Sequence, residues 1–276
     1  MTSVTPVNNE GNNILDFYQK YDEDGRMSRR PLEFARCKEI ITRYLSKDKM
    51  TILDIGGGTG AFSFWLSEQG HAVSLLDFVP GHIETVHRHE EEKGLRLEAS
   101  VIGDACCLPF GDNCFDLTLL MGPLYHLTQR QDRLKALREA YRVTTPGGII
   151  ICETISRFSS LIDGFLLDFI KDPEFVPIMK EDLISGLHRD TSAGRQYFTD
   201  AYFHHPDDVP GEIAEAGFRF EKMIAVTSFG NMIPDIETKM KKSNFSKLLL
   251  ETIKDVECEK SLMGISSHFI GIGRKI

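Results

Sequence analysis

The 276-residue sequence has no long apolar run, no excess of basic residues and no CxxC cysteine spacing. A membrane-spanning helix needs roughly 18 consecutive apolar residues, and no stretch approaches that length. The start, MTSVTPVNNEGNN, has neither the basic nor the apolar block of a signal peptide. We therefore expect a cytoplasmic protein with no membrane partner.

The net charge of −9 at pH 7 argues against a polyanionic partner, because proteins bind nucleic acid through basic surfaces that neutralise phosphates. We predict no nucleic-acid partner. Without a CxxC spacing, the cysteines are interpreted as reduced thiols in a core, and we predict no metal site. They are Cys37, Cys106, Cys107, Cys114, Cys152 and Cys258.

What the sequence does contain is a regular alternation of apolar strands and amphipathic helices. Segments with strand character fall at 50–55, 71–78, 95–103, 114–122, 147–154, 218–229 and 266–275. Such alternation is typical of a parallel sheet covered by helices on both faces. We predict an α/β, doubly wound, Rossmann-like domain over 50–276, preceded by an N-terminal helical arm and flap at 1–49. Two insertions interrupt it, at 156–205 and at 230–262.

A glycine-rich turn follows the first predicted strand, in LDIGGGTGAF (53–62). Gly56, Gly58 and Ala61 satisfy the pattern G-x-G-x-x-G/A, and Asp77 stands where a ribose-binding acid is found in dinucleotide-binding proteins. The spacing is therefore compatible with NAD.

Two further acids distinguish between nucleotide ligands. The carboxylate of Asp54, directly beside the loop, would repel a pyrophosphate but would suit a ligand with an ammonium group and a sulfonium. Asp104, just after the third predicted strand, could meet the amino group of a base. Acids at these positions fit S-adenosylmethionine better than NAD. The structural alternative is a tight turn in which Asp54 only caps the next helix.

At this point the chain resembles the class I S-adenosylmethionine-dependent methyltransferases. The motifs that carry the resemblance are ILDIGGGTG (52–60), LLDF (75–78), GDACCLPF (103–110), FDLTLLMGPLYHL (115–127) and LREAYRVTTPGGIIICE (137–153). The resemblance implies a seven-stranded sheet whose last strand runs antiparallel. It also implies Gly56 and Gly58 against the methionyl part of the cofactor, Asp77 on the ribose, Asp104 with Ala105 at the adenine, and a backbone contact from Met121.

The segment MGPLYHL resembles the small-molecule members of that class. DNA amino-methyltransferases carry Asp/Asn-Pro-Pro-Tyr/Phe here, and this chain lacks the polar first residue of that motif. His126 follows the fourth predicted strand, where substrate should lie, so we predict it as a general base with Tyr125 as its substrate-facing neighbour. A structural histidine is an equally weighted alternative.

Two clusters outside these motifs have competing interpretations. Tyr18 and Tyr21 precede several arginines, and they belong either to an ordinary amphipathic arm or to a flap that reaches the cofactor carboxylate. His82, His87 and His89 share one predicted helix, and we interpret them as part of a solvated face rather than as metal ligands.

We predict that insertion 156–205 is a lid over the acceptor, because ligands bind beyond the carboxyl ends of parallel strands. Docking of this insertion onto the core is the alternative. No strand is predicted in it. Five of its apolar residues fall at helical spacing and are predicted to form one stripe: Phe158, Leu161, Phe165, Leu166 and Phe169.

The leading hypothesis is an enzyme that transfers the methyl group of S-adenosylmethionine, by in-line displacement, to a small apolar or aromatic acceptor. The alternatives are an NAD-dependent oxidoreductase and a non-catalytic nucleotide-binding regulator. The sequence leaves open whether the acceptor atom is O, N, S or C. It also leaves the oligomeric state open.

Overall fold

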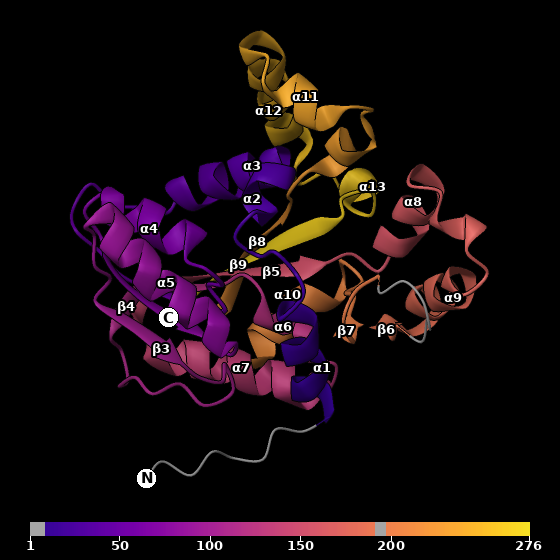
Figure 1. Ribbon diagram of the computed structural model, residues 1–276. Helices are drawn as coiled ribbons and strands as arrows, with labels where there is room; N and C mark the ends of the chain where they lie inside the picture. Colours follow the sequence, from indigo (N-terminus) through magenta and orange to yellow (C-terminus); the bar gives the residue numbers. More distant parts are fainter. Residues whose placement is uncertain (1–8, 191–196) are drawn as a thin grey trace.

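A single seven-stranded sheet runs through the computed structural model, which describes residues 9–190 and 197–276 (Figure 1). The strand order is β3-β2-β1-β4-β5-β9-β8. The bounds are β1 Thr51–Ile55, β2 Ala72–Asp77, β3 Ala99–Ile102, β4 Phe115–Leu120, β5 Thr144–Ile155, β8 Arg219–Ala225 and β9 His268–Arg274. Strands β1 to β5 are parallel, and β9 pairs antiparallel with both β5 and β8. The predicted doubly wound sheet with an antiparallel last strand is confirmed.

Helices cover both faces of the sheet and shield the apolar side chains that its strands carry on each face. One core packs α3 Pro31–Thr42, α4 Ala61–Glu68 and α5 Pro80–Lys93 against the sheet. A second core packs α7 Arg130–Val143 and α10 Asp208–Glu215 against the sheet. Because both faces are covered, the central strands β1, β2 and β4 are buried at nearly every position rather than at alternate ones.

The N-terminal arm crosses the carboxyl ends of the parallel strands. It consists of α1 Asn9–Tyr18, α2 Arg26–Arg29 and then α3. Side-chain contacts link α1 to α6 Pro123–His126, which follows β4, and to the chain just before β7 Ala201–Tyr202. The arm therefore lies against the end of the sheet where the glycine loop is found.

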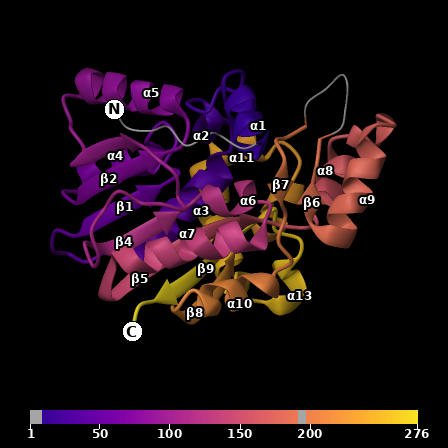
Figure 2. The ribbon, with the colours of Figure 1, turned by 90° about the horizontal axis from the view of Figure 1, so that it is seen from below.

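The insertion after β5 gathers beside the same end of the sheet, as Figure 2 shows. It contains α8 Ser159–Leu166, η1 Phe169–Lys171, α9 Phe175–Ser185 and β6 Leu187–His188, and it closes with β7. The prediction that it lacks strands is wrong, because β6 and β7 form a short antiparallel pair. Two residues per strand are too few for an alternating pattern to be visible in the sequence. Residues 191–196, within the predicted lid, lie outside the described part of the chain.

The predicted apolar stripe of this insertion is also wrong. Helix α8 ends at Leu166, and Asp168 adopts a left-handed backbone conformation, so Phe169 belongs to the separate turn η1. Phe165 is 61% exposed and Leu166 is 47% exposed. The buried face of α8 is instead its small and polar side, with Ser159, Ser160 and Gly164. Helical spacing alone did not reveal where the helix ends.

The second insertion carries η2 Ser228–Met232, α11 Ile236–Met240, α12 Ser243–Val256 and α13 Lys260–Met263. Among the described residues, no helix combines the length and the apolar character needed to cross a membrane. The six cysteines are all unpaired. Three of them, Cys107, Cys114 and Cys258, are exposed, so the interpretation of the cysteines as core thiols is correct for the other three only.

Candidate functional site

The glycine loop after β1 adopts a conformation that side chains would not allow. Gly56 and Gly58 have φ angles of +72° and +58°, a region that favours glycine. A Cβ atom on Gly56 would lie 2.6 Å from the Pro123 ring. The loop can therefore approach α6 closely, while the backbone N–H groups of Gly56 and Gly57 donate to the Leu76 carbonyl of β2.

Asp77, the last residue of β2, holds this loop in place. Its carboxylate accepts hydrogen bonds from the backbone nitrogens of Gly58 (2.8 Å) and Val79 (2.9 Å). His82 Nδ1 lies 3.0 Å from the same carboxylate. His82 is buried, so the interpretation of a solvated histidine face is wrong for this residue. Helix α5 begins at Pro80, and this start turns the first-turn residue His82 inward toward Asp77.

A cavity of about 240 Å³ opens above the loop, and we call it the loop cavity. It brings together residues from the ends of β1, β2, β3 and β4 and from the N-terminal arm. The sequence-predicted residues that line it are Tyr18, Gly56, Gly58, Asp77, Asp104, Ala105, Met121, Tyr125 and His126. The structure thus places nine of the eleven predicted site residues around one cavity.

The two remaining residues lie close by but outside the loop cavity. Tyr21 lines a second cavity, described below. Asp54 lines a small hollow beneath the glycine loop, next to Gly56 and Gly57. The Asp54 side chain is buried, and one carboxylate oxygen accepts a hydrogen bond from Ser63 Oγ at 2.7 Å while the other has no partner among the described residues. Burial raises the Asp54 pKa to about 6, although the Ser63 hydrogen bond opposes this rise.

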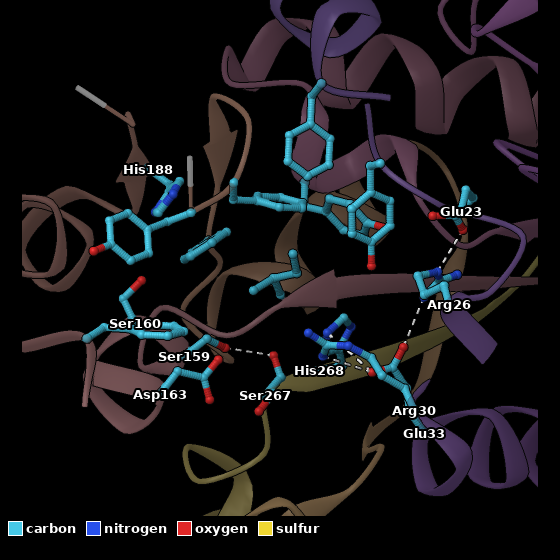
Figure 3. Close-up of a pocket in the computed structure, with 18 of the residues that line it drawn as sticks. Glu23, Arg26, Arg30, Glu33, Ser159, Ser160, Asp163, His188, Ser267 and His268 are labelled. Atoms are coloured by element: carbon cyan, nitrogen blue, oxygen red, sulfur yellow. Dashed lines mark hydrogen bonds and ion pairs between the residues drawn. The ribbon is translucent and has the colours of Figure 1, made fainter. Parts of the chain in front are cut away.

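The second cavity, about 150 Å³, lies between the N-terminal arm and the insertion after β5, and we call it the aromatic cavity (Figure 3). Aromatic side chains from α1 and the turn after it, from α6, η1 and α9, and from the chain on both sides of β7 form much of its wall. They are Phe17, Tyr18, Tyr21, Tyr125, Phe169, Phe175, Tyr197, Phe198 and Phe203. A cavity with such walls suits a flat apolar or aromatic ligand.

A network of charges forms another part of this wall, with its carboxylates buried, Arg26 partly buried and Arg30 half-exposed. Glu33 pairs with Arg26 (3.0 Å) and Arg30 (3.4 Å), and His268 Nδ1 lies 3.2 Å from Glu153. Burial opposes a charge on His268, but the carboxylates of Glu33 and Glu153 outweigh it and raise the His268 pKa. Burial also opposes ionisation of Glu33, yet His268 and the two arginines lower the Glu33 pKa to about 2.

Glu33, Glu153 and His268 also have the spacing of a metal site, since one ligand atom from each lies within 4.8 Å of the others. The guanidinium groups of Arg26 and Arg30 already pair with Glu33, however. A cation bound here would face both of them. We therefore interpret the cluster as an ion-pair network.

The two cavities share a wall. Tyr18, Glu23, Arg26 and Tyr125 line both of them, and Arg26 Nε donates to Glu23 Oε1 at 2.7 Å. Tyr125 is buried, and this burial raises its phenol pKa well above the ordinary value. A ligand over the glycine loop and a ligand in the aromatic cavity would therefore meet at this shared wall.

His126, the predicted base, lines the loop cavity rather than the aromatic cavity. Its Nε2 lies 3.0 Å from the Tyr18 hydroxyl. Burial lowers the His126 pKa to about 4 and raises the Tyr18 pKa. The imidazole is neutral at neutral pH, and its tautomer sets which of the two groups donates this hydrogen bond. The other ring nitrogen has no partner among the described residues.

Several site residues were not predicted, because only the fold brings them together. Glu33 lies on α3, Glu153 on β5 and His268 on β9, and no spacing in the sequence relates these three residues. His188 and Asp182, also near the aromatic cavity, lie on either side of the turn that ends α9. The one available signal was Glu153, which closes the last of the five sequence motifs.

Comparisons with known proteins agree with this geometry. A family model described as a methyltransferase domain matches residues 53–152. Over 178 residues the chain is 33% identical to a ubiquinone/menaquinone biosynthesis C-methyltransferase, UbiE, of a Ruegeria species, a match that covers 62% of this chain and 67% of the relative. Over 141 residues it is 31% identical to the demethylmenaquinone methyltransferase of Thermus thermophilus, which covers 50% of this chain and 58% of that relative.

A solved structure has the same fold. The S-adenosylmethionine-dependent methyltransferase of Methanosarcina mazei aligns with a TM-score of 0.57 at 20% identity, over 86% of this chain and 97% of that one. The chain spans about two thirds of the length of the Ruegeria relative and less of the Thermus relative.

Proposed function

Because the chain belongs to the class I S-adenosylmethionine-dependent methyltransferases, we propose that it methylates a small aromatic molecule that binds in the aromatic cavity. S-adenosylmethionine is the methyl donor of this family. The relatives support neither an NAD-dependent oxidoreductase nor a non-catalytic regulator. The cytoplasmic location remains a prediction from the sequence.

The observation that carries this proposal is the shared wall between the two cavities. The loop cavity contains the residues predicted to hold the cofactor, and the aromatic cavity lies on the other side of Tyr18, Glu23, Arg26 and Tyr125. In-line displacement requires the acceptor atom and the methyl donor to meet along one axis, with little water between them. The two cavities are adjacent, and transfer requires an opening between these four side chains through which donor and acceptor make contact.

Each predicted cofactor residue has a group suited to its part of the ligand. The Asp77 carboxylate suits the ribose hydroxyls, and Asp104 with Ala105 suits the adenine. Asp54 offers a carboxylate beneath the loop, where it would favour the ammonium group of the methionyl part. When bound, S-adenosylmethionine supplies a methyl group on a sulfonium, which is already a good leaving group. The protein mainly has to position the acceptor and keep water out.

The acceptor class follows from the walls of the aromatic cavity and from the relatives. Aromatic side chains favour a flat ring, whereas the nearby serines, Asp163 and the ion-pair network favour polar substituents on that ring. Both relatives are described by roles in quinone biosynthesis. We therefore propose a hydroxylated aromatic ring, of the hydroquinone or phenol type, as the first acceptor class to test.

The test measures formation of S-adenosylhomocysteine when the protein is supplied with S-adenosylmethionine and four classes of acceptor. The classes are hydroxylated aromatics, aliphatic amines, thiols and carboxylic acids. We expect turnover with the hydroxylated aromatics, and mass spectrometry should find the added methyl group on the acceptor. Turnover with amines, thiols or carboxylic acids, and none with hydroxylated aromatics, would contradict the proposed acceptor class.

A further inference from the structure

A buried histidine–carboxylate pair lies in the insertion after β5, outside the residues used so far. His188, at the end of β6, places Nδ1 2.9 Å from Oδ2 of Asp182 on α9. Ser160 on α8 donates from Oγ to the same oxygen. His188 is 2% exposed and Asp182 is fully buried. Three elements of the insertion therefore hold this pair away from solvent.

The hydrogen bond to Asp182 determines which ring nitrogen of His188 is available. A carboxylate can only accept, so the proton of a neutral imidazole lies on Nδ1 and Nε2 carries a free lone pair. Nε2 is buried and has no partner among the described residues, and His188 lines the aromatic cavity. An unsatisfied buried acceptor is costly, so this nitrogen is suited to a donor that arrives with a ligand.

The surroundings of His188 indicate the kind of molecule that would bring this donor. The His188 ring stacks on Phe203, with centroids 4.7 Å apart and planes at 21°, and Phe198 lies 6.2 Å away. Figure 3 shows His188 at the opposite end of the cavity from Glu23 and Arg26, which belong to the shared wall. A flat ring between these ends could meet the methyl donor at one side and His188 at the other.

We propose that the His188–Asp182 pair accepts a hydrogen bond from a phenolic hydroxyl of the methyl acceptor, at the end of the aromatic cavity remote from the methyl donor. His188 is then a positioning and specificity residue, and Asp182 fixes its tautomer. This inference rests on the proposed function, because it specifies the acceptor as a ring with a free hydroxyl away from the methylated atom.

A matched pair of probes tests the hydrogen bond directly. Binding of 4-methylphenol and of toluene, which lacks the hydroxyl, is measured by ligand-observed NMR on protein saturated with S-adenosylhomocysteine. For the wild-type chain we expect 4-methylphenol to bind about tenfold more tightly than toluene, the ratio expected for one hydrogen bond to a buried acceptor.

Three variants separate the hydrogen bond from the shape of the cavity. His188→Phe keeps a flat ring but removes the acceptor, so the preference for 4-methylphenol should disappear while toluene binding stays within about twofold. His188→Gln offers a carbonyl oxygen near the position of Nε2 and should restore part of the preference. Asp182→Asn can donate to Nδ1 and so protonate Nε2, and it should also remove the preference.

His205→Gln is the matched control. His205 lies on the same segment with an acidic neighbour, Asp207, 3.5 Å away, and it lines neither cavity. This variant should keep the wild-type preference. Unchanged S-adenosylhomocysteine affinity and thermal melting show that each variant is folded.

The inference is wrong if the wild-type chain shows no preference for 4-methylphenol, including the case of no binding. It is equally wrong if His188→Phe retains the preference while the cofactor still binds. The acceptor panel is a separate measurement. A clear probe preference without turnover of any hydroxylated aromatic would overturn the proposed function and leave the hydrogen-bond site in place.

Discussion

At the scale of single residues, Asp54 shows how a predicted binding group can reduce stability. Its carboxyl is buried, with one oxygen unpartnered, and its folded pKa of about 6 lies above the ordinary value of 3.8. A group with a raised pKa contributes its full stability below the unfolded pKa and loses it as the pH rises through the folded pKa. At neutral pH the ionised side chain therefore destabilises the cofactor-free protein.

Replacement of this acid should change stability and affinity in opposite directions. A pKa rise of this size corresponds to about 3 kcal/mol. We expect Asp54→Asn to raise the free energy of unfolding at pH 7 by up to about 3 kcal/mol, with little gain left at pH 4. Urea titrations without cofactor measure this gain. S-adenosylhomocysteine should bind the variant more weakly, and equal stability of both proteins at pH 7 would contradict the account.

Asp77 combines a local structural role with the predicted ribose contact. We expect Asp77→Ala to weaken S-adenosylhomocysteine binding by about 2 to 3 kcal/mol, because charge-assisted hydrogen bonds to the ligand and to the loop are lost together. Calorimetry measures this change. Asp116→Ala is the control, because the Asp116 carboxylate bonds to Thr51 at the other end of the sheet and lines neither cavity. Unchanged affinity in Asp77→Ala would remove this residue from the cofactor site.

At the scale of elements, the hydrogen bond between Tyr18 and His126 joins α1 to α6 over the loop cavity. Two roles for His126 follow from this contact. The imidazole can act as the predicted base, or it can serve mainly as the hydrogen-bond partner that holds Tyr18 in place. Its pKa of about 4 keeps it unprotonated at neutral pH in either role.

Two variants distinguish these roles. If His126 is the base, His126→Ala should lower kcat by about 100-fold. Tyr18→Phe removes only the hydroxyl, and it should weaken cofactor binding with little change in kcat. In the wild-type chain, kcat should not show an imidazole-controlled fall between pH 8 and pH 6, since protonation occurs near pH 4. Equal kcat values in the two variants would show that His126 has a structural role and is not the base.

The elements also show how far the sequence could predict the fold and the site. The sheet was predictable because each central strand is a short apolar run between turn residues, and the loop cavity because its residues follow those strands. The β6–β7 pair and the end of α8 could not be predicted from the sequence, because short strands and helix ends depend on tertiary contacts. An acceptor site for an apolar or aromatic molecule under insertion 156–205 was predicted, but its charged wall was missed, since His268 and Glu33 meet only when β9 pairs with β5 beside α3.

At the scale of the whole molecule, the aromatic cavity lies between two segments that flank one end of the sheet. The N-terminal arm and the insertion after β5 both contribute to its walls. Segments that close over ligands exclude water during transfer. We propose that insertion 156–205 acts as a lid that closes over the aromatic cavity.

Hydrogen exchange tests the motion. We expect amide exchange in 156–190 and 197–205 to slow when S-adenosylhomocysteine and 4-methylphenol are added together, because ligand contacts hold the insertion closed. Helix α12, which is packed through Leu249 and Ile253 and lines neither cavity, is the internal control and should not change. Equal protection with and without ligands would instead identify a fixed insertion.

The central claim is that donor and acceptor bind in two cavities that meet at Tyr18, Glu23, Arg26 and Tyr125. A crystal structure of the ternary complex with S-adenosylhomocysteine and 4-methylphenol tests it most directly. We expect the ribose at Asp77, the sulfur facing the shared wall, and the phenol ring in the aromatic cavity with its hydroxyl on His188 Nε2. A cofactor bound away from the glycine loop, or a phenol outside the aromatic cavity, would contradict the account.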